Sequence, residues 1–109
     1  DESLQDILTA VSGSGPAYVF YLAEAMTAGG IAGGLDADTA RLLTTQTIVG
    51  AAKLLAESDA DAVELRRRVT SPNGTTAAAI AAFDERSVRD AISAGVLAAA
   101  QRSAELSGG

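Results

Sequence analysis

The segment Val69–Thr76, which reads Val-Thr-Ser-Pro-Asn-Gly-Thr-Thr, divides the chain because it separates two stretches of helical pattern. Pro72 prevents the preceding helix from continuing, since its ring clashes with the previous turn and it has no N–H to donate. Asn73 and Gly74 are the residue types that best tolerate a positive φ, so the chain can turn sharply here. Good helix formers follow from Thr75 onward. The segment therefore predicts two helices joined by a tight turn.

The same segment brings hydroxyl groups to the start of a helix. First-turn N–H groups of a helix lack intrahelical partners, and the helix dipole adds partial positive charge there. Ser71, Thr75 and Thr76 supply three hydroxyls at this position. A carboxylate or phosphate could be held here without any Lys or Arg. The alternative is that one hydroxyl simply caps the helix, which is the more frequent use of such residues. Local chemistry leaves both interpretations open.

The composition predicts one domain with a thin core. A chain of 109 residues is the size of a single domain. Alanine is abundant and contributes little buried area, whereas the chain has only two Phe, two Tyr, one Met and no Trp. A monomer of this size already hides only about two thirds of its unfolded surface. We therefore expect a second copy of the chain to complete the core.

Charge and missing residue types exclude several classes of function. The formal net charge of −6 argues against nucleic acid and against acidic membrane surfaces as partners. The chain has no Cys and no His, which leaves no disulfide framework, no thiolate chemistry and no His metal site. We expect no metal site. The first residues lack the basic-then-apolar layout of a secretion signal, so a cytoplasmic location is expected.

Helical spacing of apolar residues covers most of the chain, and no strand pattern or internal repeat is present. The sequence predicts an all-α fold, a bundle of about five or six helices. The expected helices span residues 3–11, 16–33, 37–56, 62–69, 75 to 83 or 85, and 87 or 88 to 106. Several ends carry capping residues: Ser3, Asp36 and Asp61, the last with Glu64 completing a capping box.

The predicted helix from Pro16 to Gly33 is apolar all round, and Glu24 is its only charge. A helix without a polar face is buried on all sides, which in so short a chain requires a partner subunit. A membrane span over residues 13–35 is the alternative, because the segment is long enough. Glu24 near its middle and the acidic flanks, without a basic anchor, argue against a span. We interpret the glycines near residue 33 as the helix end and a close-packing point.

Two groups of basic residues have simple structural explanations. Arg66, Arg67 and Arg68 close a predicted helix, where positive charge is favourable without any ligand. A functional alternative is that one Arg lends positive potential to the adjoining turn, but the structural explanation is preferred. Lys53 is interpreted as a solvated residue and not as a catalytic amine.

Three segments together resemble one enzyme family. They are Val69–Thr76, Ser12–Tyr18 (Ser-Gly-Ser-Gly-Pro-Ala-Tyr) and Gly50–Lys53. Their order and spacing are similar to the C-terminal helical domain of pyrroline-5-carboxylate reductases, whose signature reads Val-(Thr/Ser)-Ser-Pro-Gly-Gly-(Thr/Ala)-Thr. Asn73 departs from this signature, but it tolerates a left-handed backbone. The glycines of the second segment do not form a dinucleotide loop, because no strand precedes them and Tyr18 stands where a third Gly belongs.

The resemblance implies a fold, a reaction and roles for named residues. The fold would be an intertwined dimer like the C-terminal domain of 6-phosphogluconate-dehydrogenase-like reductases. The reaction would reduce L-Δ1-pyrroline-5-carboxylate to L-proline with NADPH or NADH, held by an N-terminal Rossmann domain that residues 1–109 do not contain. By resemblance, Ser71, Asn73, Gly74, Thr75 and Thr76 would bind substrate, with Thr76 nearest the imine nitrogen.

The chain alone is expected to be inactive, because it contains no dinucleotide site. Expected partners are a second copy of the chain, possible higher assemblies of such dimers, and the small-molecule substrate or L-proline; neither nucleic acid nor a membrane is expected. Two alternatives remain at this point: a purely structural helical oligomerisation module without a ligand site, and a membrane-spanning dimer.

Overall fold

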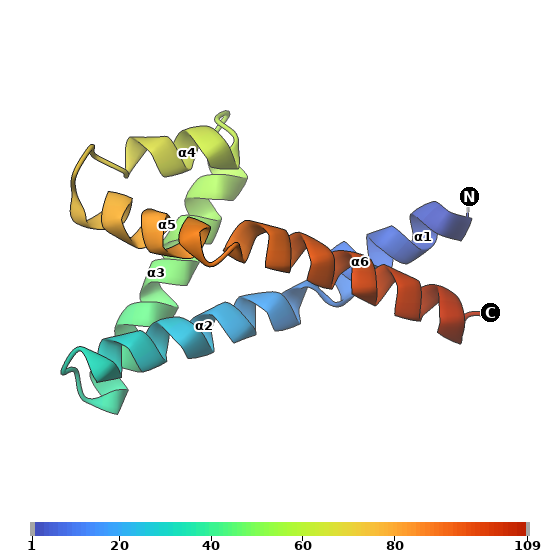
Figure 1. Ribbon diagram of the computed structural model, residues 1–109, viewed down its shortest axis with the longest axis horizontal. Helices are drawn as coiled ribbons and strands as arrows, with labels where there is room; N and C mark the ends of the chain where they lie inside the picture. Colours follow the sequence, from blue (N-terminus) through green and yellow to red (C-terminus); the bar gives the residue numbers. More distant parts are fainter. Residues whose placement is uncertain (1, 109) are drawn as a thin grey trace. The chain divides into compact units, whose positions relative to one another are not determined.

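The computed structural model describes residues 2–108, with side chains from residue 4 onward, and shows six α-helices and one π-helix within that range (Figure 1). No strand occurs among the described residues, so the all-helical prediction is confirmed. The helices are α1 (Glu2–Leu8), η1 (Thr9–Gly13), α2 (Gly15–Ala32), α3 (Ala37–Glu57), α4 (Ala62–Arg68), α5 (Thr75–Glu85) and α6 (Val88–Leu106).

The chain divides into two units, of which the first contains residues 1–18 and 72–109 and the second contains residues 19–71. In the first unit, α1 and η1 both pack against α6, and α5 packs against the same helix. Figure 1 shows the blue α1 beside the orange-red α6. Ser103 on α6 donates a hydrogen bond of 2.8 Å to the Asp6 carboxylate on α1. The first unit is therefore built around α6.

The π-helix η1 is a feature that the sequence did not predict. A loop was expected at residues 12–15, but the helix continues to Gly13, and α2 begins at Gly15, one residue earlier than expected. The Tyr18 hydroxyl donates a hydrogen bond of 2.7 Å to the carbonyl of the fully buried Ala10. Tyr18 lies eight residues further along the chain, so the helical spacing of neighbouring residues could not reveal this contact.

In the second unit, α2 ends in a Schellman motif. The Leu35 N–H donates to the Gly30 carbonyl and the Gly34 N–H donates to the Ile31 carbonyl, both at 3.0 Å. Gly34 has a φ of 116°, a conformation that a residue with a Cβ rarely adopts. The prediction that glycine ends this helix is confirmed at Gly34.

The helices α2 and α3 meet at a close contact that small residues make possible. A Cβ added to Gly30 would lie 3.3 Å from the Ala40 Cβ and 3.3 Å from Leu35 Cδ1. Ala40 and Thr44, one turn apart on α3, are the buried residues of this helix. The predicted cap of α3 is confirmed, because the Asp36 carboxylate accepts a hydrogen bond of 2.8 Å from the Thr39 N–H.

Two predicted helix starts differ from the structure in detail. The first helix begins at Glu2, ahead of the predicted cap at Ser3, whose side chain lies outside the described side chains. The Asp61 cap is confirmed by a 2.9 Å hydrogen bond from the Glu64 N–H. The Glu64 carboxylate, however, pairs with Arg68 at 3.2 Å, since the i,i+4 arginine competes with the return bond of a capping box.

The described residues bury very little apolar surface. Ala10 and Ala40 are the buried apolar residues, and no residue of α2 is buried. Tyr21 is 76% exposed and Phe20 is 66% exposed. Burying one such side chain contributes roughly 1.5–3 kcal/mol, so the chain leaves much of its stabilising surface unused. Among the described residues, no helix is long and apolar enough to cross a membrane.

Replacing Gly30 by Ala is expected to destabilise the second unit, because the new Cβ would press on Ala40. The overpacking penalty, typically about 1–3 kcal/mol, outweighs the gain in helix propensity of about 1 kcal/mol. Gly95→Ala is the matched control, since a Cβ at Gly95 meets nothing within 4 Å. Thermal unfolding should show a lower Tm for the first variant and an equal or higher Tm for the second. Equal gains in both would contradict the close contact.

The Asp36 cap should make stability depend on pH on the acid side. Hydrogen bonds from the Thr39 N–H, and then from its hydroxyl, hold the pKa of Asp36 below the ordinary value of 3.8. The stabilisation is therefore fully present above that value and is lost as the pH falls through the lowered pKa. Asp36→Asn keeps a neutral cap whose strength does not depend on pH. The difference in Tm between the unsubstituted chain and this variant should therefore become smaller towards acid pH. Asp59 does not cap a helix, so the difference in Tm between Asp59→Asn and the unsubstituted chain should not change in this way with pH.

Candidate functional site

The helix α4 ends in hydrogen bonds that lead the chain into the segment singled out above. The Val69 N–H donates to the Arg66 carbonyl at 3.2 Å, and the Thr70 N–H donates to the Arg67 carbonyl at 3.1 Å. The Thr70 hydroxyl also donates to the Arg66 carbonyl. Thr70 is therefore committed to closing α4, and Val69, predicted as the last helical residue, lies just beyond the helix.

The turn after α4 is made by Asn73 in a left-handed conformation with a φ of 61°. Its tolerance of this conformation is confirmed. Gly74 does not use its tolerance of a positive φ, because it is extended, with a φ of −88° and a ψ of −176°, and is the N-cap of α5. One left-handed residue suffices to reverse the chain, and the next must be extended to begin the helix.

No side chain caps the start of α5. Gly74 has no side chain to offer, and the first backbone hydrogen bond runs from the Ala78 N–H to the Gly74 carbonyl at 3.1 Å. The interpretation in which a Ser or Thr hydroxyl merely caps this helix is therefore wrong. A first turn with open N–H groups, on a helix of 11 residues, keeps its hydrogen-bonding capacity and its partial positive charge for another group.

The predicted site residues differ in exposure. Ser71, Asn73 and Thr75 are exposed, and Gly74 and Thr76 are half-buried. The five residues are neighbours along the chain, but Ser71 belongs to the second unit and Asn73 onward belongs to the first. The structure thus brings together Asn73 to Thr76 at the start of α5 and places Ser71 at the end of the other unit.

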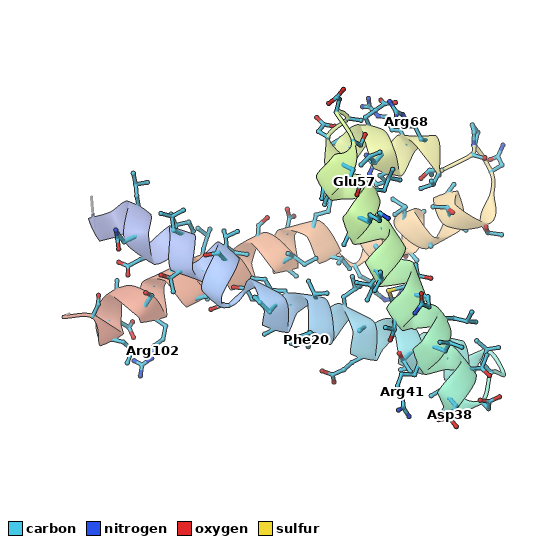
Figure 2. All side chains as sticks on the ribbon, turned by 180° about the vertical axis from the view of Figure 1, so that it is seen from behind. Phe20, Asp38, Arg41, Glu57, Arg68 and Arg102 are labelled. Carbon is cyan, nitrogen blue, oxygen red and sulfur yellow. The ribbon has the colours of Figure 1, made fainter. Side chains whose placement is uncertain are left out.

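The basic residues fit their structural explanations. Arg66, Arg67 and Arg68 occupy the last turn of α4, and Arg68 forms the ion pair with Glu64. Figure 2 shows the Arg68 side chain at this end of α4. Lys53 is exposed, as interpreted from the sequence.

Glu24 and Arg41 are two residues whose neighbourhood the sequence did not indicate. The structure places both on the lining of one groove between α2 and α3. The spacing of Arg41 from Asp36 along α3 gave no signal of this, since the neighbourhood depends on how two helices cross. Among residues 4–108, no group of three or more acidic side chains is placed to hold a metal ion.

Fold and site together describe a helical domain with an extensive uncovered apolar surface, in which α5, like α6, begins without a side-chain cap. The sequence family described as pyrroline-5-carboxylate reductase dimerisation matches residues 2–106. The chain belongs to this family. Self-association is what the family's description states, and it agrees with the uncovered surface of α2.

Curated relatives are longer than this chain. It is 53% identical over 106 residues to the pyrroline-5-carboxylate reductase of Pseudomonas aeruginosa, covering 97% of the chain and 39% of the relative. The reductase of Synechocystis is 44% identical over 105 residues, covering 96% of the chain and again 39% of the relative. The chain therefore spans about two fifths of the length of these relatives.

Solved structures of pyrroline carboxylate reductases also contain a part that superposes on this chain. The pyrroline-5-carboxylate reductase of Coxiella burnetii superposes with a TM-score of 0.93 at 40% identity, covering 100% of this chain and 40% of that one. A Plasmodium falciparum pyrroline carboxylate reductase, solved with NADP bound, superposes with a TM-score of 0.89 at 33% identity, covering 94% of this chain and 39% of that one.

The turn makes a direct prediction about Asn73. Asn73→Gly should leave the Tm nearly unchanged or raise it slightly, because glycine adopts a φ of 61° without strain. Asn73→Val should destabilise by about 1–2 kcal/mol, since a β-branched side chain is strained in this region. Chemical denaturation of the three proteins measures the difference. Equal stability of the valine and glycine variants would contradict the left-handed turn.

Proposed function

We propose that this chain is the dimerisation and substrate-binding part of a pyrroline-5-carboxylate reductase, which reduces L-Δ1-pyrroline-5-carboxylate to L-proline. The observation that carries the proposal is the start of α5, where Gly74 leaves the first-turn N–H groups without a side-chain cap. A substrate carboxylate has the charge and geometry that such N–H groups favour. The relatives named above, all pyrroline carboxylate reductases, supply the substrate class.

Different residues of the turn would bind different parts of the substrate. The N–H groups of Thr75 and Thr76 and the exposed hydroxyls of Ser71 and Thr75 would hold the carboxylate, and Asn73 with Gly74 would shape the turn. The half-buried Thr76 would place its hydroxyl by the imine nitrogen and so fix the ring. A threonine hydroxyl is too weak an acid to protonate an imine, so its role would be orientation and hydrogen bonding.

The cofactor would be NADPH or NADH, which supplies hydride to the imine carbon. The Plasmodium falciparum relative was solved with NADP bound. We propose that the nucleotide is held by a Rossmann domain outside residues 1–109, and that the whole enzyme acts in proline biosynthesis in the cytoplasm as a homodimer or an assembly of dimers. The chain by itself should then not oxidise NADPH.

The decisive experiment joins this chain to the N-terminal domain of the Pseudomonas aeruginosa relative, because the shared part is 53% identical. The chimera should reduce pyrroline-5-carboxylate with NADPH. Thr76→Val should lower kcat/KM roughly 10- to 100-fold, which is the usual effect of losing a hydrogen bond to a group that is charged or becomes charged in the transition state. The control is Thr47→Val, an exposed threonine on α3, which should leave kcat/KM unchanged.

Unchanged kcat and KM in the Thr76 variant would refute its role. NMR of the isolated chain with added L-proline separates the proposal from a purely structural oligomerisation module. Under the proposal, amide shifts concentrate at Ser71 and at residues 73–76. An inactive chimera together with no shift at those residues would favour the structural module.

A further inference from the structure

An open groove of about 520 Å³ lies between α2 and α3, within the second unit. Its lining is mostly apolar or small, with Phe20 and Ile31 from α2 and the buried Thr44 from α3. Glu24 and Arg41 are the charged residues on the lining. Phe20 is 66% exposed, so the groove is an open apolar surface and not a closed cavity.

Glu24 is the only charge on α2. Among the described residues, none of the ion pairs involves Glu24. Because its neighbours Phe20, Tyr21 and Ala28 on α2 are apolar, a surface that covers the helix here also encloses this carboxylate. An enclosed carboxylate without a positive partner is strongly unfavourable, and such groups are found paired. Covering α2 therefore requires a cation opposite Glu24.

Arg41 is free to be that cation. Its contact with Asp38 is 3.5 Å long, and the two side chains are 71% and 93% exposed. Figure 2 shows both side chains projecting from the first turns of α3. An exposed pair of this kind contributes almost nothing to stability, so Arg41 gives up little by changing partners.

We propose that this groove binds the same groove of a second copy, and that Glu24 of each copy pairs with Arg41 of the other. In a two-fold symmetric interface, residue i meets residue j and j meets i. A surface that carries one acid and one base beside an apolar centre is therefore complementary to itself, and a single contact yields two ion pairs. The family's dimerisation and the uncovered residues of α2 identify the occupant as a second copy.

Charge exchange tests the proposal. Glu24→Arg and Arg41→Glu should each weaken self-association at least about tenfold in Kd, because each places like charges opposite one another twice. Mixing the two variants in equal amounts should restore a tight heterodimer, since arginines on one copy then face glutamates on the other. The chain that carries both substitutions should form a tight homodimer. Sedimentation or native mass spectrometry measures all four samples.

The mixture distinguishes pairing between copies from pairing within one chain. If the double variant associates tightly but the mixture does not, Glu24 and Arg41 pair within one chain and the proposal is overturned. Unchanged Kd in both single variants would show that the groove is not the interface. Arg102→Glu, an exposed charge in the first unit, is the control and should leave Kd unchanged.

A single variant that loses helical circular dichroism is replaced by its milder form, Glu24→Gln or Arg41→Gln. In a double-mutant cycle of these forms, the two substitutions should be clearly non-additive in Kd. Additive effects would overturn the pairing.

Discussion

The constraint on which this structure depends is a helix without a polar face that its own chain leaves uncovered. α2 carries one charge in 18 residues, yet none of its residues is buried. Water around so much apolar surface is costly, and the free energy is recovered only when another surface covers it. The fold is therefore best understood as half of an interface, in keeping with the family of dimerisation domains to which it belongs.

Small residues at the contact between α2 and α3 contribute to this situation. Gly30 and Ala40 let α2 and α3 approach until a Cβ on the glycine would lie 3.3 Å from its neighbour. An interior made of alanine and threonine has no room for large side chains, so Phe20 and Tyr21 remain outside. A conventional domain buries most of its large apolar side chains, whereas a domain completed by a second copy can leave them exposed until that copy covers them.

Features set by neighbouring residues could be predicted from the sequence, and features set by distant contacts could not. The caps at Asp36 and Asp61 and the left-handed Asn73 follow from local backbone chemistry, and all were found. In the π-helix η1, the Ala10 carbonyl accepts a hydrogen bond from Tyr18, a contact that residue spacing does not reveal, and the sequence indicated a loop there. The groove whose lining includes both Glu24 and Arg41 likewise arises from the crossing of two helices.

The start of α5 has no side-chain cap, and this missing interaction supports the carboxylate site that we propose there. A Ser or Asp at position 74 would satisfy one first-turn N–H and would stabilise the helix, by up to a few tenths of a kcal/mol compared with glycine. Gly74 forgoes that gain, although hydroxyl residues stand on either side of the turn. Natural sequences depart from the locally best residue most often where function demands it. A carboxylate-binding helix start needs its N–H groups open, and glycine at the cap is the residue that leaves them so.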